Sequence, residues 1–407
     1  MQTHPLTGRR VIELGTMVAA PFAAHILSQL GAEVIKVEPA WGDPTRSLVR
    51  GGPSGTFIAY SHGKKSICFD LTNADGHAAF CKLLSTADAF LHNLAPKTVR
   101  RLRLTRQDCA RIKPDLIYCH IRGYGPGPQE DDLASNPVAE AATGVMEANR
   151  INGRPSRLGP SYHDQFAGAY AVIGILASML QPGEQERVVE VGLYETGLHV
   201  ASRDLVGVQL KTQLLGRPER EPHGEFSMPG YGAYRTSDGR WVYLLMLTDN
   251  HWLRFCQAMQ LPQADDQQLV TLKKRKKMRD QVEEIVKNAI GGYSFDDVVR
   301  RLQAVGMGFT EVLPLEQVLD APQARQPGKL RTINYRGFEF AVPEFPRFGA
   351  AGGDPPTTPP PELGEHTIEV LQSIGMDAMQ RDALLASGAV AAVKPDDFPW
   401  ATVRKQS

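Results

Sequence analysis

The chain is predicted to be an α/β protein whose large domain contains a parallel sheet covered by helices. Short apolar stretches alternate with amphipathic ones along the first half of the 407 residues, which is typical of strands that alternate with helices. The connections between these stretches are short, and this favours strand–helix–strand units. A chain of this length is expected to form two domains.

The elements of the first half follow from local signals. Residues 11–14 predict the first strand, and Pro21 is suited to the first position of a helix over 22–30 that ends at Gly31. The next strand is predicted over 32–38. Further strands are predicted at 66–70, 89–93 and 116–122, with helices at 75–85, 98–102 and 105–112. In such a sheet, the loops at the carboxyl ends of the strands carry the functional residues.

The second half changes in composition several times. A long apolar helix is predicted over 165–180 and a strand over 187–193, before a hairpin that turns near Asp238 and helices from Trp252 to Ala304. A Pro-rich run at 352–361 is typical of an extended linker. We therefore divide the chain into a large domain at 1–204, a linker at 205–225, a small α+β domain at 226–328, a linker at 329–362 and a C-terminal part at 363–407.

Composition excludes several classes of function. Forty-five basic residues balance forty-five acidic ones, so no overall field favours nucleic acid. The basic run 273–277 is interpreted as a solvated helical face. The five cysteines are scattered without a CxxC pair, which indicates free thiols in a reducing compartment and no metal site. No signal sequence or long apolar stretch is present, so we expect a cytoplasmic protein without a membrane partner.

Two segments bear on chemistry. The first strand is followed by Gly15, Thr16 and Met17 rather than by GxGxxG, so the dinucleotide fingerprint is absent. Asp164 stands just before a strongly apolar helix, where the helix dipole and the first-turn amides favour a carboxylate. Taken alone, this aspartate is interpreted as an ordinary helix cap.

An ordered set of segments resembles a known family. The segments are residues 6–14, 30–39, 42–46, 93–96, the Asp164 region, the Tyr-Gly loop at 228–234 and residues 363–367. Together they resemble the family III CoA-transferases, the group that includes formyl-CoA:oxalate and carnitine CoA-transferases. The resemblance implies a large Rossmann-like domain formed by both chain ends, a smaller domain inserted between them, and an interlocked homodimer.

The resemblance also implies site residues. Asp164 matches the family's nucleophile, and His163 beside it is expected to support the site rather than act as a base. The loop Gly230, Tyr231 and Gly232 and the start of the helix after Asp164 are candidate sources of oxyanion donors. Coenzyme A, which is part of the substrate rather than a permanently bound cofactor, is expected to meet Val18, Ala19, Phe69, Asn93, Leu94 and, through a phosphate, Arg101.

The implied reaction moves CoA from an acyl-CoA to a free carboxylic acid through an aspartyl mixed anhydride and an aspartyl-CoA thioester. Val18 and Pro39 replace a glutamine and an arginine of the formyl-CoA transferase pattern, while Asn136-Pro137 and the Tyr-Gly loop look more like the carnitine and mesaconyl-CoA branches. A small dicarboxylate is therefore the preferred substrate class. Intramolecular CoA transfer within a dicarboxylate remains open. A 2-methylacyl-CoA racemase is disfavoured, because its histidine would fall near Ser135-Asn136, where this chain has none; an alignment shifted toward His120 or His163 would restore one.

Overall fold

The chain divides into two compact units. A computed structural model describes residues 4–49, 52–181, 187–216, 228–345 and 358–392. The larger unit combines Met1–Leu205 with Pro327–Ser407, and the smaller one is Val206–Gln326. Within the described residues, no helix has the length and hydropathy that crossing a membrane would require.

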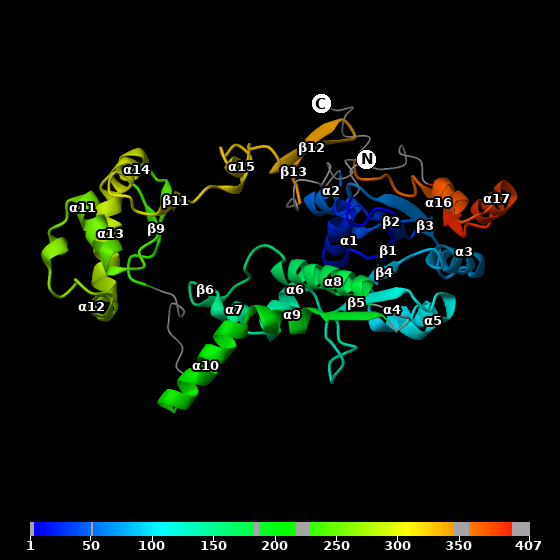
Figure 1. Ribbon diagram of the computed structural model, residues 1–407, viewed down its shortest axis with the longest axis horizontal. Coiled ribbons are helices and arrows are strands. Elements are labelled where there is room, and N and C mark those ends of the chain that lie inside the picture. The colour runs from blue at the N-terminus through cyan, green and yellow to red at the C-terminus, as the bar shows by residue number, and fades with distance from the viewer. Residues whose placement is uncertain (1–3, 50–51, 182–186, 217–227, 346–357, 393–407) are drawn as a thin grey trace. The chain divides into compact units, whose positions relative to one another are not determined.

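The larger unit is built on a seven-stranded sheet of order β14-β3-β2-β1-β4-β5-β8 (Figure 1). All neighbouring strands run parallel except β14, which pairs antiparallel with β3. The large parallel sheet expected from the sequence is confirmed. The strands are β1 (Arg10–Leu14), β2 (Glu33–Glu38), β3 (Lys65–Phe69), β4 (Ala89–His92), β5 (Ile117–Arg122), β8 (Val188–Gly192) and β14 (Val390–Ala391).

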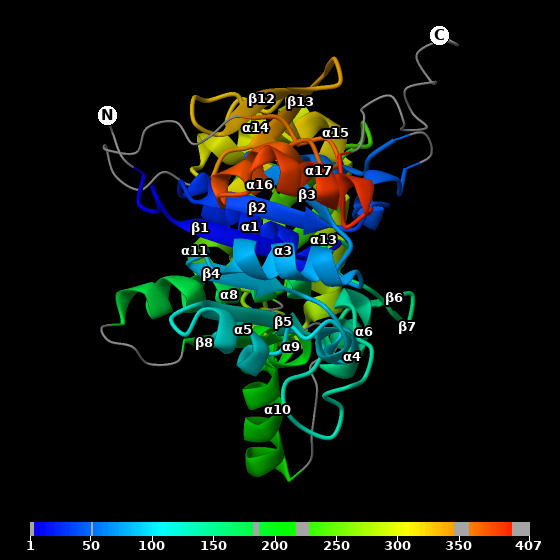
Figure 2. The same ribbon diagram turned by 90° about the vertical axis from the view of Figure 1, so that its right-hand side faces the viewer.

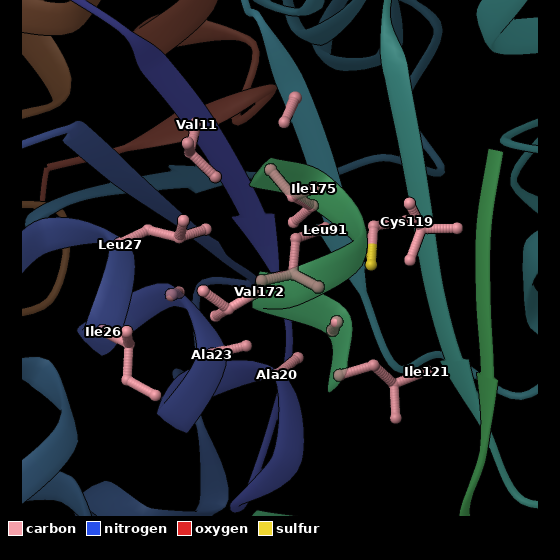
Figure 3. Packing of buried hydrophobic residues seen from close by; sticks show 14 of the residues in the cluster. Val11, Ala20, Ala23, Ile26, Leu27, Leu91, Cys119, Ile121, Val172 and Ile175 are labelled. Carbon is pink, nitrogen blue, oxygen red and sulfur yellow. The ribbon is translucent and has the colours of Figure 1, made fainter. Parts of the chain in front are cut away.

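One face of this sheet is covered by α1 (Ala19–Gln29) and α8 (Tyr162–Leu180). Figure 3 shows side chains of both helices packed against residues of the strands, including Val11 and Leu91. The two helices approach closely at Gly168, where a Cβ atom would lie 2.7 Å from the carbonyl oxygen of Ala19. Since only a residue without a side chain fits there, Gly168 brings the start of α1 against the first turns of α8.

The opposite face is covered by α3 (Ala74–Leu84), α5 (Arg106–Ile112), α16 (Thr367–Ser373) and α17 (Ala378–Ala386). Figure 2 shows the two C-terminal helices beside β3, and α16 supplies buried Val370 and Leu371 to the same core as Phe80 of α3. The C-terminal segment therefore completes the fold that the N-terminal segment begins.

Both helices on the first face of the sheet, α1 and α8, begin earlier than the sequence indicated. The first starts at Ala19 rather than at residue 22, so Pro21 occupies the first turn but not its first position. The helix expected over 165–180 starts at Tyr162, because Asn136 caps its first turn from outside. Asp164 thus lies within the first turn of α8 and not before it.

Neither predicted linker is a plain linker. The segment 205–225 begins with α10 (Ser202–Leu215), a helix with no buried residue, and residues 217–225 lie outside the described part. The segment 329–362 contains a hairpin of β12 (Leu330–Tyr335) and β13 (Phe338–Pro343), and most of the Pro-rich run lies outside the described residues. Alternating side chains of the hairpin pack with Phe57, which gives these residues a core of their own.

The remaining elements of the larger unit are short and were not predicted from the sequence, apart from α4. They are η1 (Pro44–Arg46), α2 (Gly55–Ser61), α4 (Pro96–Arg101), α6 (Asn136–Ala142), α7 (Val145–Ala148), β6 (Arg150–Ile151), β7 (Arg154–Pro155) and α9 (Leu193–Val200).

The smaller unit is an α+β fold around one hydrophobic cluster that includes Trp252, Phe255 and Val286. The basic run 273–277 is not wholly solvated: Arg275 is buried and pairs with Asp249 at 2.8 Å, which corrects the expectation of a solvated face. Its elements are β9 (Gly232–Arg235), β10 (Trp241–Leu244), α11 (Asp249–Met259), η2 (Pro262–Asp265), α12 (Leu272–Lys277), α13 (Arg279–Gly291), α14 (Phe295–Ala304), β11 (Phe309–Glu311) and α15 (Leu315–Val318).

Candidate active site

A cavity of about 360 Å³ opens in the larger unit at the carboxyl ends of β1, β4 and β5. The strand order reverses between β1 and β4, which is where ligands bind in open α/β sheets. The lining residues are Thr16, Met17, Val18, Ala19, Asn93, Leu94, Ala95, Pro96, Ile121, Arg122, Gly123, Asp132, Leu133, Ala134, Ser135, Asn136, Pro137, Ser161, Asp164 and Leu193.

The loop after β1 is held from the β4 side by Asn93. The side-chain amide of Asn93 donates to the carbonyl oxygen of Thr16 at 2.8 Å and accepts from the main-chain N–H of Thr16 at 2.9 Å. Met17 then adopts a left-handed φ of 65°. The main-chain N–H groups of Val18 and Ala19 make no hydrogen bond to any described residue. The loop therefore presents free donors at the N-terminal end of α1, along the cavity wall.

Two buried lysines hold both ends of this loop. The Lys36 ammonium donates to the carbonyl oxygen of Gly15 at 2.7 Å, and the Lys64 ammonium donates to that of Pro21 at 2.9 Å. Glu13 lies between them and pairs with Lys36 at 2.9 Å and with Lys64 at 2.6 Å. Burial lowers the pKa of Lys64 to about 8, against the opposing charge of Glu13. The buried ionic cluster of Glu13, Lys36 and Lys64 thus holds the loop that forms this part of the cavity wall.

Asp164 lines this cavity, and its carboxylate has no partner among the described residues. Its carboxylate accepts no hydrogen bond and forms no ion pair within the described part of the chain. Burial raises the pKa of Asp164 to about 6; Arg157 opposes this shift and Glu140 adds to it. The group is therefore mainly ionised at neutral pH, yet more basic than an exposed aspartate.

Asn136 positions the start of α8. Its side-chain oxygen accepts from the main-chain N–H groups of His163 at 2.9 Å and Asp164 at 3.3 Å. Its amide nitrogen donates to buried Glu140 at 2.5 Å, and the other oxygen of Glu140 accepts from the N–H of Leu158 at 3.1 Å. The backbone of Asp164 is thus fixed by a cap that comes from another helix.

This cap corrects one expectation. The start of α8 was a candidate source of oxyanion donors, but all four amides of its first turn are already used. Besides the two bonded to Asn136, the N–H of Tyr162 donates to the carbonyl oxygen of Pro160 at 2.8 Å, and that of Gln165 donates to Ser161 at 3.0 Å. The main-chain N–H groups of Val18 and Ala19, at the start of α1, are free and belong to residues that line the cavity.

His163 is turned away from the cavity. Its side chain is fully buried, and its Nε2 atom lies 3.4 Å from the hydroxyl oxygen of Thr143. A Cβ atom on Gly197 of α9 would approach that nitrogen to 2.6 Å, so the ring is wedged between helices. Burial lowers the pKa of His163. The ring packs between α8, which carries Asp164, and its neighbouring helices; its role in the reaction stays a prediction.

The other residues expected at the site lie in three different surroundings. Val18, Ala19, Asn93 and Leu94 line the cavity with Asp164. Phe69 is buried in the core with its ring 6.0 Å from that of Phe80, and Arg101 is exposed at the end of α4; neither lines the cavity.

The loop Gly230–Gly232 lies in the smaller unit. Gly230 has a φ of 81°, and its N–H donates to Glu283 at 3.1 Å, while the N–H of Tyr231 donates to the carbonyl oxygen of Met228 at 3.0 Å. These two amides are therefore engaged within the smaller unit, and we do not count them among free oxyanion donors.

Two polar lining residues, Asn136 and Arg122, were not predicted to act at the site. Asn136 was noted for its resemblance to other branches and as the place of a racemase's histidine; Asn136-Pro137 marks the start of α6, but no local signal shows that Asn136 caps α8. Arg122 was not considered; its place at the end of a predicted strand was the available signal, because strand ends carry functional residues.

The comparisons with known proteins agree on one family. The model of CoA-transferase family III matches residues 6–367. The α subunit of succinyl-CoA–L-malate CoA-transferase from Chloroflexus aurantiacus is 29% identical over 91% of this chain and 89% of that protein. Succinate–glutarate CoA-transferase from Agrobacterium fabrum is 28% identical over 91% of this chain and 96% of that protein. The crystal structure of Rv3272 from M. tuberculosis has a TM-score of 0.79 at 26% identity, over 91% of this chain and 100% of that chain.

Proposed function

Because the chain belongs to CoA-transferase family III, we propose that it moves CoA from an acyl-CoA to a small dicarboxylic acid, with Asp164 as nucleophile. The observation that carries this proposal is the carboxylate of Asp164, which lines the cavity without a partner and has a raised pKa. A desolvated carboxylate that is still ionised keeps its lone pairs available for attack. We further propose that the protein is cytoplasmic and forms a homodimer; analytical ultracentrifugation of the purified protein tests the dimer, and cell fractionation tests the location.

The reaction is balanced without any net proton transfer. A carboxylate oxygen of Asp164 attacks the thioester carbon, the carbon–sulfur bond breaks, and CoA thiolate leaves a mixed anhydride behind. The thiolate then attacks the side-chain carbon of Asp164, and the first acid departs as a carboxylate. The incoming acid attacks the aspartyl-CoA thioester, and the released thiolate attacks the acid's own carbon. Asp164 is thereby regenerated.

Each attack develops negative charge on a carbonyl oxygen. Donors aimed at that oxygen lower the barrier more than any other single feature of an acyl-transfer site. We assign this role to the free main-chain N–H groups of Val18 and Ala19, since both residues line the cavity at the positive end of α1. The hydrogen bonds from Asn93 and from the buried lysines keep these amides in place.

The substrate class rests on the relatives and on this chain's departures from the formyl-CoA pattern. The two similar enzymes above are named for succinyl-CoA with malate and for succinate with glutarate. Both names describe four- or five-carbon dicarboxylates. We therefore propose succinyl-CoA, or a thioester of similar size, as the CoA donor.

A racemase is a weaker candidate. It needs a second base opposite Asp164, but Ser135 and Asn136 occupy the wall where its histidine is expected. The described lining includes no histidine, and His163 faces the neighbouring helices. Neither a serine nor an asparagine side chain accepts a proton near neutral pH.

Mass spectrometry with labelled oxygen tests the proposal. With an acceptor acid whose carboxylate carries two ¹⁸O atoms, the anhydride route leaves one ¹⁸O on Asp164 after each turnover. A later donor acid departs with that atom, so after several turnovers the released acid should gain 2 Da. A direct attack of the acceptor on the thioester would label the released acid from the first turnover and never label Asp164, whereas the covalent route releases an unlabelled acid in the first turnover; label in the first released acid with none on Asp164 would contradict the covalent route.

The variant Asp164→Ala should lower transfer by at least about 10³-fold, as is usual when a covalent nucleophile is removed. Asp115→Asn, a change of an exposed aspartate before β5, is the control and should keep full activity. Turnover of succinyl-CoA that needs no added acceptor, with CoA migrating between the two ends of ¹³C-labelled acid, would indicate the intramolecular reaction instead.

A further inference from the structure

Arg122 is a buried cation with hydrogen-bond donors to spare. It is the last residue of β5 and lines the same cavity as Asp164, with a side chain that is 10% exposed. Its Nη2 atom donates to the carbonyl oxygen of Glu130 at 3.2 Å and lies 3.7 Å from the Glu130 carboxylate. Its Nε atom is buried without any partner. Unsatisfied donors of a buried charge cost free energy, so Arg122 is suited to bind an anionic group.

The charges of the cavity wall make Arg122 distinctive. Among the described lining residues, it is the only cation, and the other two ionisable groups are the carboxylates of Asp132 and Asp164. An acid with a second carboxylate is repelled by both aspartates. The guanidinium of Arg122 is the one lining group that can offset this repulsion, and its planar fork matches a carboxylate.

We propose that Arg122 binds the second carboxylate of a dicarboxylic acyl group while Asp164 attacks the thioester carbon. This inference rests on the proposed function and names the residue that selects its substrate class. A cavity of about 360 Å³ is large enough for a four-carbon acyl chain together with the thiol end of CoA. The donor acid and the acceptor acid use Arg122 in turn, since each forms the same anhydride with Asp164.

The ion pair between Arg122 and Glu130 is weak enough for a substrate carboxylate to replace it. Its side chain is 49% exposed and its carboxylate stays 3.7 Å from Arg122. An ion pair of that length at the surface contributes little free energy. A substrate carboxylate that reaches the unpartnered Nε side of the guanidinium can therefore bind without first breaking a strong internal contact.

The test compares succinyl-CoA with butyryl-CoA. Both esters carry a four-carbon acyl chain and the same CoA, and they differ in charge only by the distal carboxylate. The rate of aspartyl-CoA formation on the enzyme, measured by intact mass, gives the efficiency for each ester. A contact of Arg122 with a CoA phosphate would change both efficiencies together, whereas a contact with the acyl carboxylate changes one.

The expected result is selective. Arg122→Met should lower the efficiency with succinyl-CoA about 10- to 100-fold, which corresponds to one lost charge-assisted pair, and change butyryl-CoA by less than about threefold. Arg122→Lys should fall between the wild type and the methionine variant, because it keeps the charge but loses the fork. Arg111→Met, which removes an exposed arginine paired with Asp108, is the control and should match the wild type.

Glu130→Gln gives a second readout that does not depend on a core change. Removing the competing carboxylate should raise the efficiency with succinyl-CoA about two- to fivefold and leave butyryl-CoA unchanged. If Arg122→Met does not fold, Glu130→Gln decides the question. The same ratio of efficiencies for succinyl-CoA and butyryl-CoA in Glu130→Gln as in the wild type would overturn the inference.

The outcomes separate the inference from the proposed function. Adducts from both esters, with the same ratio in Arg122→Met as in the wild type, would refute the role of Arg122 and leave CoA transfer standing. An equal loss with both esters would assign Arg122 to a CoA phosphate and also refute it. The absence of any wild-type adduct with either ester would overturn the proposed function itself.

Discussion

Replacing Asp164 with asparagine should make the protein inactive and more stable. The folded chain keeps this carboxyl in surroundings that disfavour its charge, and burial raises its pKa from 3.8 to about 6. Since a tenfold change in acidity corresponds to about 1.4 kcal/mol, ionised Asp164 lowers the free energy of unfolding by about 3 kcal/mol at pH 7.5. The side-chain amide of the Asp164→Asn variant carries no charge and therefore avoids this cost.

The dependence on pH has a definite sign. The folded state binds the proton more tightly than the unfolded chain, so the cost is absent below pH 3.8 and grows as the pH rises to 6. The stability gain of Asp164→Asn should thus be about 3 kcal/mol at pH 7.5 and about half of that at pH 5.

Asp164 lies in the larger unit, so amide hydrogen exchange within that unit measures the gain in its free energy of unfolding. Trp252, a fully buried tryptophan, lies in the smaller unit, so its fluorescence would report on the unfolding of that unit. The amides of β4, a fully buried strand, should exchange about 100-fold more slowly in Asp164→Asn than in the wild type at pH 7.5. Asp115→Asn should leave that rate unchanged. Equal or faster exchange in Asp164→Asn at pH 7.5 would refute the reasoning.

Three further predictions concern the same site. The kcat/KM of the wild type should fall about tenfold for each pH unit below 6, as Asp164 becomes protonated, while a flat profile down to pH 5 would contradict the raised pKa. Asn136→Ala should destabilise the larger unit by about 1–3 kcal/mol, because two amides lose their acceptor and Glu140 loses a donor; urea unfolding monitored by exchange of α8 checks this. Gly168→Ala should displace α1 from α8 and lower activity at least about tenfold, whereas Gly55→Ala, where the added Cβ meets no atom within 4 Å, should leave activity unchanged in the same assay.

The sequence was informative wherever the signal is local or repeated. The parallel strands of the sheet are short runs rich in apolar residues, of which Ala89–His92 is wholly buried, and their positions were predicted to within about two residues. The family was recognised from motifs spread over most of the chain, and the comparisons confirm it. Asp164 was singled out in the same way, and its role as nucleophile stays a prediction.

Contacts between distant residues could not be predicted from such signals. The cap on α8 joins Asn136 to the N–H of His163, and nothing in either local sequence specifies the other. The hairpin of β12 and β13 was taken for linker because it adjoins a Pro-rich run, although its own residues alternate as in a strand. Arg275 looked solvated within a basic run, but tertiary packing turns one member of that run inward.

The antiparallel pairing of β14 with β3 has a consequence for biosynthesis. Phe69 of β3 pairs with Val390 of β14, which the ribosome synthesises more than three hundred residues later. The helix α16, which covers β3, also emerges late. Until then the nascent chain carries an open sheet edge, the kind of surface that promotes aggregation and chaperone binding. Chains that end before residue 367 should therefore aggregate at concentrations where the full chain stays dispersed, which light scattering can measure.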